Sequence, residues 1–450
     1  MLLKSELHFA PRRSFHDAWA FILLLLFSGT FTGIGIARIY SISLDKSKTN
    51  GLVNELIKGL GFNLAISMVL NMMMFCLYSV APKLVIYTSL FLMPLCCLIL
   101  GFVVDQRGMI ATAGLSLFLS VLVWLYIRGH IDIIAQLFST TSSMLNSHIF
   151  ALLFNFLLLI VLNGTIGVCM AFSFGEKEDI GNAIGTALIF SIFWINSFFM
   201  YLFDVFTAGI ITGELLKKTS SERDDREASV AGRALGNMAY AMGSVAFGAL
   251  IIAVIKTLRY LVNSKRQRSV RSDEQPGAFE MVILCMADCT LSLVESYVHV
   301  LNKFTFSYLA ITGDSYRKAI NDSFELLSKK ENVAFKSFVA AEYTQNFLFM
   351  IQTILIVGLN IGYVVFRKKS DPVVIAAIFG GVLSILLTFQ FCNVMSSGTL
   401  ALSYLQIMAP QNVKNYDINL HKALATIQHG KNYDVVSYEQ TNVESTERVE

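Results

Sequence analysis

The stretch from residue 234 to residue 255 contains no charged side chain. At about 1.5 Å per residue, a helix of this length crosses a bilayer core of roughly 30 Å. Gly236, Gly243 and Gly248 lie within the stretch, and small residues let neighbouring membrane helices approach closely. The charged residues from Lys256 to Arg271 are all cations. The stretch therefore predicts a closely packed membrane-spanning helix that ends at a basic membrane face.

The composition indicates many such helices rather than one anchor. Hydrophobic residues make up 55% of the chain and charged residues 15%, whereas soluble domains carry about 25% charge. The mean hydropathy is +0.60 over 450 residues. A net charge of +3 gives no reason to expect a nucleic-acid partner. Most of the seven cysteines lie in apolar stretches, which argues against a disulfide framework.

The rest of the chain predicts an all-α, polytopic membrane protein with about ten transmembrane helices. The further apolar stretches of spanning length are residues 18–37, 61–80, 84–104, 108–127, 149–174, 180–203, 279–311, 343–366 and 373–393. Residues 128–146 have apolar side chains at helical spacing, which is typical of an amphipathic helix on the cytoplasmic surface. We expect a cytoplasmic N-terminus (1–16), a transporter domain (17–410) and a cytoplasmic, disordered tail (411–450).

Simple alternation of the spans conflicts with one part of the sequence. It places the basic segment from Lys256 to Arg271 outside the cell, against the positive-inside rule. A break near Thr207, Ala208 and Gly209 would turn the chain back and remove the conflict. The helix over residues 279–311 would then be re-entrant or interfacial. We expect this arrangement, with plain alternation as the alternative.

The sequence contains no pattern typical of a soluble enzyme. None of the seven histidines forms an HExxH pair, and no P-loop is present, which argues against an ATP-driven pump. Cys285 and Cys289 beside Asp288 supply too few ligands for a convincing metal site, and buried thiols are the more common explanation. We therefore expect no enzymatic activity, no cofactor and no metal.

The stretch over residues 180–203 and its continuation carry the best candidate for a binding site. Trp194, Ser197, Tyr201 and Asp204 fall on one face of one helix. An ionisable residue inside a membrane is a functional hypothesis by default. Aromatic faces with one carboxylate also suit a quaternary ammonium ion, which has no N–H to donate. The alternative is that Trp194 and Tyr201 pack or lie near headgroups, while Asp204 meets interfacial water.

Further candidates lie on the next two apolar stretches. Tyr240, Ser244 and Phe247 share a helical face that could complete a substrate site, although helix packing is the more common explanation for such a face. Tyr308 is another candidate for substrate binding. Asp288 and Glu295, together with Asp204, are candidates for ion or proton coupling, and a solvated helix face is the alternative for the first two.

Four segments of the chain resemble the choline transporter-like family. They are Gly243–Ile251 (GSVAFGALI) preceded by Arg233-x-Leu235, Phe193-Trp194-Ile195 followed by Ala208-Gly209, Asp17-x-Trp19-Ala20, and Leu301-Asn302-Lys303 with Tyr308 and Gly313. The resemblance covers about residues 15–410. It implies uptake or exchange of choline or a related cation without ATP. The chain departs from the family in its short loop after the first span, at Gly213–Leu216, around Gln406 and at Ser197.

Together these observations predict a secondary transporter for choline or another small amine. The alternative is a non-transporting scaffold, or a channel or lipid-handling protein of the same fold. We expect a multi-pass protein of the plasma membrane, with an endomembrane as the alternative and both termini in the cytoplasm. Its partners would be the substrate and the lipid bilayer, and we expect a monomer.

Overall fold

The structure is a computed structural model, and every element that it describes is helical. It describes residues 14–41, 46–103, 107–172, 182–219, 229–271, 278–329, 333–367, 371–418 and 420–421. The helices in these ranges are α1 (Ala18–Ser41), α2 (Lys46–Val80), α3 (Pro82–Val103), α4 (Arg107–Ile127), η1 (Arg128–His130), α5 (Ile131–Asn146), α6 (Ile149–Phe172), α7 (Asn182–Thr219), α9 (Val230–Arg271), α10 (Ala278–Thr312), α11 (Tyr316–Lys329), α12 (Val333–Phe366), α13 (Asp371–Met408) and α14 (Pro410–Tyr416).

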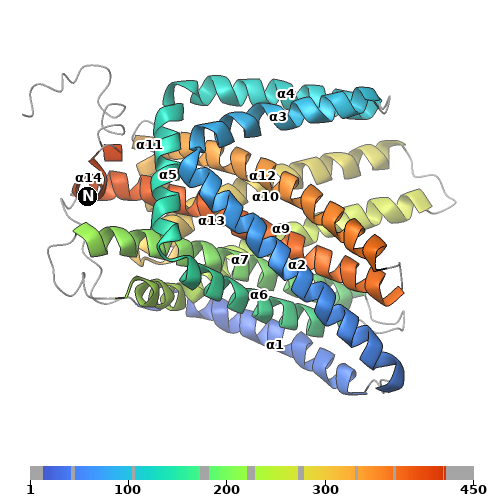
Figure 1. The fold of residues 1–450 in the computed structure, drawn as a ribbon. Helices are drawn as coiled ribbons and strands as arrows, with labels where there is room; N and C mark the ends of the chain where they lie inside the picture. The colour runs from blue at the N-terminus through green and yellow to red at the C-terminus, as the bar shows by residue number, and fades with distance from the viewer. Residues whose placement is uncertain are drawn as a thin grey trace, which may run out of the picture.

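The long helices run side by side, and α5 crosses one end of them (Figure 1). Helix α7 packs against α9, α10 and α13, while α13 also packs against α2 and α12. In the described residues, eight segments are long and apolar enough to cross a membrane, and two shorter apolar stretches lie in α3 and α13. The prediction of an all-α polytopic membrane protein is confirmed. The number of about ten crossings stays a prediction.

The break predicted near Thr207 is wrong, because α7 continues from Asn182 to Thr219. The Thr207 hydroxyl donates to the Phe203 carbonyl at 2.9 Å, so this polar side chain is satisfied within the helix. A Cβ at Gly209 would lie 3.2 Å from the Ala234 Cα. The small residues therefore bring α7 close to α9 instead of interrupting α7.

Helix α10 is also continuous, and it packs against both α7 and α9. A segment of spanning length, Met281–Thr312, lies within it. The prediction of a re-entrant or interfacial helix over residues 279–311 is therefore wrong. With α7 unbroken, α10 takes a regular place in the bundle and plain alternation accounts for the helix order.

The basic end of α9 and the start of α1 lie at opposite ends of the bundle (Figure 1). The prediction that both face the cytoplasm is therefore wrong. Part of the basic segment is paired with α10: Arg259 bonds Asp288 Oδ1 at 3.0 Å and Glu295 Oε2 at 2.9 Å. Arg266 Nη1 also lies 3.7 Å from Asp288 Oδ2. Two of the six cations between Lys256 and Arg271 thus lie against acids of α10.

The two ends can be compared in one labelling experiment. We expect a membrane-impermeant thiol reagent to modify only one of Ser14→Cys and Gln267→Cys in intact cells, because the bilayer separates these positions. The exposed native cysteines, Cys76, Cys285 and Cys289, are first replaced by serine. Equal labelling of the two variants would contradict the arrangement of α1 and α9.

Helix α5 is more deeply packed than a helix lying on a membrane surface. Phe138, Thr141 and Ser142 are all buried, and the Ser142 hydroxyl donates to the Phe75 carbonyl at 3.0 Å. The start of the predicted disordered tail is also ordered, because α14 packs against α7 and α13 and Val413 is buried. Residues 1–13 and 422–450 of the predicted terminal segments lie outside the described residues.

Gly243 lies where the chain crosses α9 just before entering α1. A Cβ at this position would contact the His16 carbonyl oxygen and lie 2.9 Å from the Asp17 carbonyl oxygen. The Asp17 carboxylate accepts hydrogen bonds from the Ser244 hydroxyl at 2.6 Å and from the Tyr316 N–H at 3.1 Å. Gly243 therefore makes room for a backbone segment, and Asp17 fixes that segment to α9 and α11.

We expect Gly243→Ala to lower the melting temperature of the purified protein. The added methyl group displaces the backbone at residues 16–17, and overpacking of this kind costs about 1–3 kcal/mol. Gly236→Ala is the matched control, because nothing lies within 4 Å of a Cβ there. Its melting temperature should equal or slightly exceed that of the parent, since alanine favours a helix over glycine. Equal melting of both variants would contradict the close approach.

Candidate functional site

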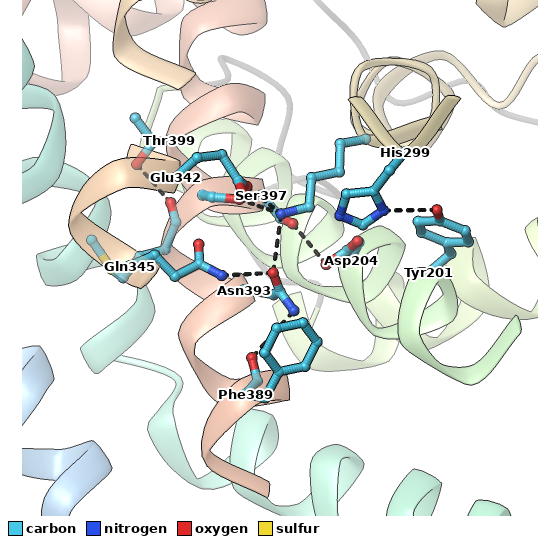
Figure 2. A network of polar contacts seen from close by, with 12 residues as sticks. Tyr201, Asp204, His299, Glu342, Gln345, Phe389, Asn393, Ser397 and Thr399 are labelled. Atoms are coloured by element: carbon cyan, nitrogen blue, oxygen red, sulfur yellow. Dashed lines mark hydrogen bonds and ion pairs between the residues drawn. The ribbon is translucent and has the colours of Figure 1, made fainter. Parts of the chain in front are cut away.

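Polar side chains from four helices meet inside the bundle, and we call this group the polar centre. Its members are Tyr201 and Asp204 of α7, His299 and Lys303 of α10, Glu342 and Gln345 of α12, and Asn393, Ser396 and Ser397 of α13. Figure 2 shows side chains of these helices pointing toward one another. Charged groups inside membrane helices are rare and cluster at functional sites.

Lys303 is the cation of the polar centre and is only 1% exposed. Its ammonium donates to Glu342 Oε1, to Asn393 Oδ1 at 3.0 Å and to Ser396 Oγ at 3.0 Å. An ammonium has three protons to donate, so these three acceptors satisfy Lys303 completely. Helices α10, α12 and α13 are thereby joined at one point.

Asp204 is the second carboxylate of the polar centre and is buried. The Ser397 hydroxyl donates to Asp204 Oδ1 at 2.7 Å. Asp204 Oδ2 is also buried, and in the described part of the chain it has no hydrogen-bond partner. An unpaired oxygen of a buried carboxylate is costly. This atom is therefore the position in the polar centre that most needs a cationic or proton-donating partner.

An aromatic surface lies beside these charges. The Tyr201 hydroxyl is 2.9 Å from His299 Nδ1, and the Tyr201 ring centroid is 4.9 Å from that of Phe306. On the far side, Gln345 Nε2 donates to Asn393 Oδ1 at 2.6 Å. The Glu342 side chain keeps 25% of its surface exposed, whereas Tyr201 and Asp204 are buried. A carboxylate beside an aromatic ring suits a small organic cation.

The formal charges of the polar centre sum to a single negative charge. Asp204 and Glu342 contribute two carboxylates, and Lys303 contributes one ammonium. A neutral His299 adds nothing. A net charge inside a membrane protein requires compensation, because the surroundings cannot solvate it. One monovalent cation would leave the polar centre neutral.

Trp194 lies away from the polar centre. Its indole Nε1 donates to the Ala246 carbonyl of α9 at 2.9 Å, and its ring centroid lies 5.5 Å from Phe190 and 6.1 Å from Phe27. These are contacts of helix packing. The residues predicted to share one face of α7 thus have different surroundings. Tyr201 and Asp204 belong to the polar centre, while Trp194 packs α7 against α9 and α1. Its predicted role in binding stays a prediction.

Two of the three candidates on α9, Ser244 and Phe247, lie together, and Tyr240 does not join them. Tyr240 is 49% exposed, whereas Ser244 is buried and bonds Asp17. The Phe247 ring centroid lies 5.2 Å from those of Trp19 and Tyr316. These contacts place Ser244 and Phe247 at the entrance to α1, against the start of α11.

Tyr308 is buried beside α11 and α13. Its hydroxyl donates to Asp322 Oδ2 at 3.4 Å, and its ring meets the edge of Tyr404 at 6.0 Å between centroids. Asp288 and Glu295 are bonded to Arg259. Both acids are therefore paired with an arginine, whereas an acid that binds a transported ion or proton would need to be available to it. Their predicted role in coupling stays a prediction.

The comparison with family models decides the relationship of this chain to known proteins. Residues 110–410 match the model described as plasma-membrane choline transporter. This region includes every member of the polar centre.

The chain belongs to the plasma-membrane choline transporter family.

Curated relatives agree with this membership of the plasma-membrane choline transporter family. Choline transporter-like protein 1 of Caenorhabditis elegans is 28% identical over 293 residues, covering 56% of this chain and 37% of that protein. Protein PNS1 of Mycosarcoma maydis is 22% identical over 348 residues, covering 71% and 64%. A CTL-like protein of Dictyostelium discoideum is 27% identical over 143 residues, covering 32% and 25%. The chain thus aligns with less than two thirds of each of these relatives.

Sequence reasoning about this member of the choline transporter family named Tyr201 and Asp204 and missed the other seven members of the polar centre. Glu342 directly precedes the predicted span that starts at residue 343, so it is interpreted as a charge flanking that span. His299 and Asn393 gave no signal because their partners are distant in sequence. Lys303 is noticeable as a charge within the apolar stretch 279–311 and in a family-like segment, but it is not predicted to belong to a site. An acid at the edge of one apolar stretch and a lysine inside another were the available signal. In the described residues no cluster could hold a metal ion.

We expect Trp194→Leu to lower the melting temperature of this choline transporter family member with little effect on cation affinity. The change removes the hydrogen bond to Ala246 and part of the ring packing, at a cost of about 2–4 kcal/mol. The dissociation constant for choline, measured on the folded fraction, should change by less than about threefold. An increase of about thirtyfold, the size of a desolvated cation–π contact, would instead place Trp194 at the substrate.

Proposed function

We propose that this protein carries choline, or another small organic cation with one positive charge, across the plasma membrane without ATP. Family membership supports membrane transport in general. The observation that supports a cation in particular is the polar centre, with two carboxylates against one ammonium. The substrate would lie against Asp204 Oδ2 and the Tyr201 ring.

The environment of Asp204 favours a quaternary ammonium over a metal ion. A small metal ion needs several oxygen ligands to replace its water, and Asp204 offers one free oxygen. A trimethylammonium group is large and weakly hydrated, and it needs only a counter-charge and an aromatic face. Tyr201, with its ring against Phe306, supplies such a face.

Movement of the substrate would follow from the position of the polar centre. Its members belong to four long helices, and secondary transporters bind their substrates between such helices inside the membrane. Alternating access would then proceed by movement of the packed helices around this point. The part-exposed Glu342 marks the side from which the cation would enter in the present conformation.

The test is uptake of radiolabelled choline into proteoliposomes that contain the purified protein. A carrier saturates with choline, and ethanolamine at excess should reduce the uptake. Uptake that rises linearly with choline concentration would indicate a channel. No uptake above that of protein-free vesicles, with choline and ethanolamine both failing to bind, would support the scaffold alternative and overturn the proposal.

We expect Asp204→Asn to reduce choline uptake by roughly tenfold or more, because the amide keeps the shape of the side chain and removes its charge. A loss of this size corresponds to about 1.4 kcal/mol. Asp132→Asn is the matched control, since the side chain of Asp132 is 84% exposed and pairs with Lys83 at the bundle surface. Its uptake should equal that of the parent. Normal uptake by folded Asp204→Asn would contradict the role of Asp204.

A further inference from the structure

We propose that Lys303 is a tethered counter-ion that sets the charge of the substrate which the polar centre accepts. The inference rests on the proposed function and adds a selection rule to it. By formal charge, Lys303 balances one of the two carboxylates, and its three hydrogen bonds go to Glu342, Asn393 and Ser396 rather than to Asp204. The polar centre therefore selects for one positive charge, against zwitterions and against dications.

The first supporting observation is the hydrogen bonding of the Lys303 ammonium group. Its three protons are donated to acceptors on α12 and α13, namely Glu342, Asn393 and Ser396. The Ser396 hydroxyl itself donates to Glu342 Oε1 at 2.9 Å. Lys303 and Glu342 thus form a closed, hydrogen-bonded ion pair. No proton of Lys303 is left for Asp204.

The second support is the state of Asp204. Its Oδ1 receives a hydrogen bond from Ser397, the residue next to Ser396, so the two carboxylates attach to neighbouring positions of α13. Its Oδ2 is buried and has no hydrogen-bond partner in the part of the chain that the structure describes. One carboxylate of the polar centre is thus ion-paired with Lys303, and the other receives its hydrogen bond from Ser397.

Because Lys303 is fixed in place, the net formal charge of the polar centre can be changed by substituting Lys303 or Glu342. The parent has a net charge of −1, from Asp204, Glu342 and Lys303. Lys303→Met makes it −2, and Glu342→Gln makes it 0. The double variant returns to −1, with two uncharged side chains in place of the ion pair. If Lys303 only held the helices together, the net charge of the polar centre would have no relation to the charge of the preferred ligand.

The test compares three ligands that share a trimethylammonium head. Betaine has no net charge, choline has one positive charge, and (2-aminoethyl)trimethylammonium has two when its amine is protonated. Binding of each is measured by calorimetry on purified protein, at one pH at which that amine is protonated. Ratios of affinity on the same protein sample are independent of the yield of folded protein.

We expect the parent to bind choline best. Lys303→Met should shift the ratio of dication affinity to choline affinity by about tenfold or more toward the dication. Glu342→Gln should weaken choline binding by about tenfold or more. The double variant Lys303→Met/Glu342→Gln should bind choline within about threefold of the parent. Lys83→Met is the control, because the side chain of Lys83 is 61% exposed and far from the polar centre in the sequence, and it should leave all ratios unchanged.

The outcomes separate this inference from the proposed function. A parent that binds none of the three ligands overturns the proposed function, and the inference with it. A parent that binds choline, with ratios unchanged in Lys303→Met, overturns the inference alone. If Lys303→Met does not fold, the comparison of Glu342→Gln with the double variant decides: recovery of choline binding supports charge balance, and a folded double variant without recovery contradicts it.

Discussion

An ammonium group inside a membrane bundle needs acceptors for its three protons, and the arrangement of helices around Lys303 meets that need. The acceptors come from α12 and α13, while the lysine comes from α10. Removing α10 or α12 from this contact would leave a charge without a partner in an apolar medium, at a cost of several kcal/mol. Removing α13 would leave two protons of the ammonium without acceptors. This interaction therefore constrains the relative positions of α10, α12 and α13. Helix α7 joins the same point through Asp204 and Ser397.

Close packing by small residues makes this convergence sterically achievable. Gly209 brings α7 against Ala234 of α9. At Gly248 a Cβ would lie 2.7 Å from the Tyr316 ring, and the Gly248 carbonyl accepts a hydrogen bond from Asn302 at 3.1 Å. Asn302 precedes Lys303, so the glycine of α9 also fixes the height at which Lys303 enters the bundle. The glycine-containing stretch of α9 thus acts on the polar centre indirectly, through the depth of α10.

The charges at the other end of α9 take part in a tertiary contact that the local sequence does not show. Arg259 bonds two acids of α10, and Arg266 lies near one of them. The positive-inside rule counts Lys and Arg and gives acids little weight, so it does not register these ion pairs. The break near Thr207 is predicted from the charges alone, and the continuous α7 excludes it.

The sequence by itself determined the all-α membrane architecture, the positions of the spans and the membership of Tyr201 and Asp204 in a polar face of α7. Hydropathy and helical spacing are local properties, so they can be read without knowing what packs against what. Only the tertiary structure decided that Asp204 meets Ser397, that Lys303 meets Glu342, and that Trp194 bonds α9 instead of joining them. The rotation and depth of each helix decide such meetings. Both are set by side-chain packing between segments far apart in the chain, and no periodicity within one segment records them.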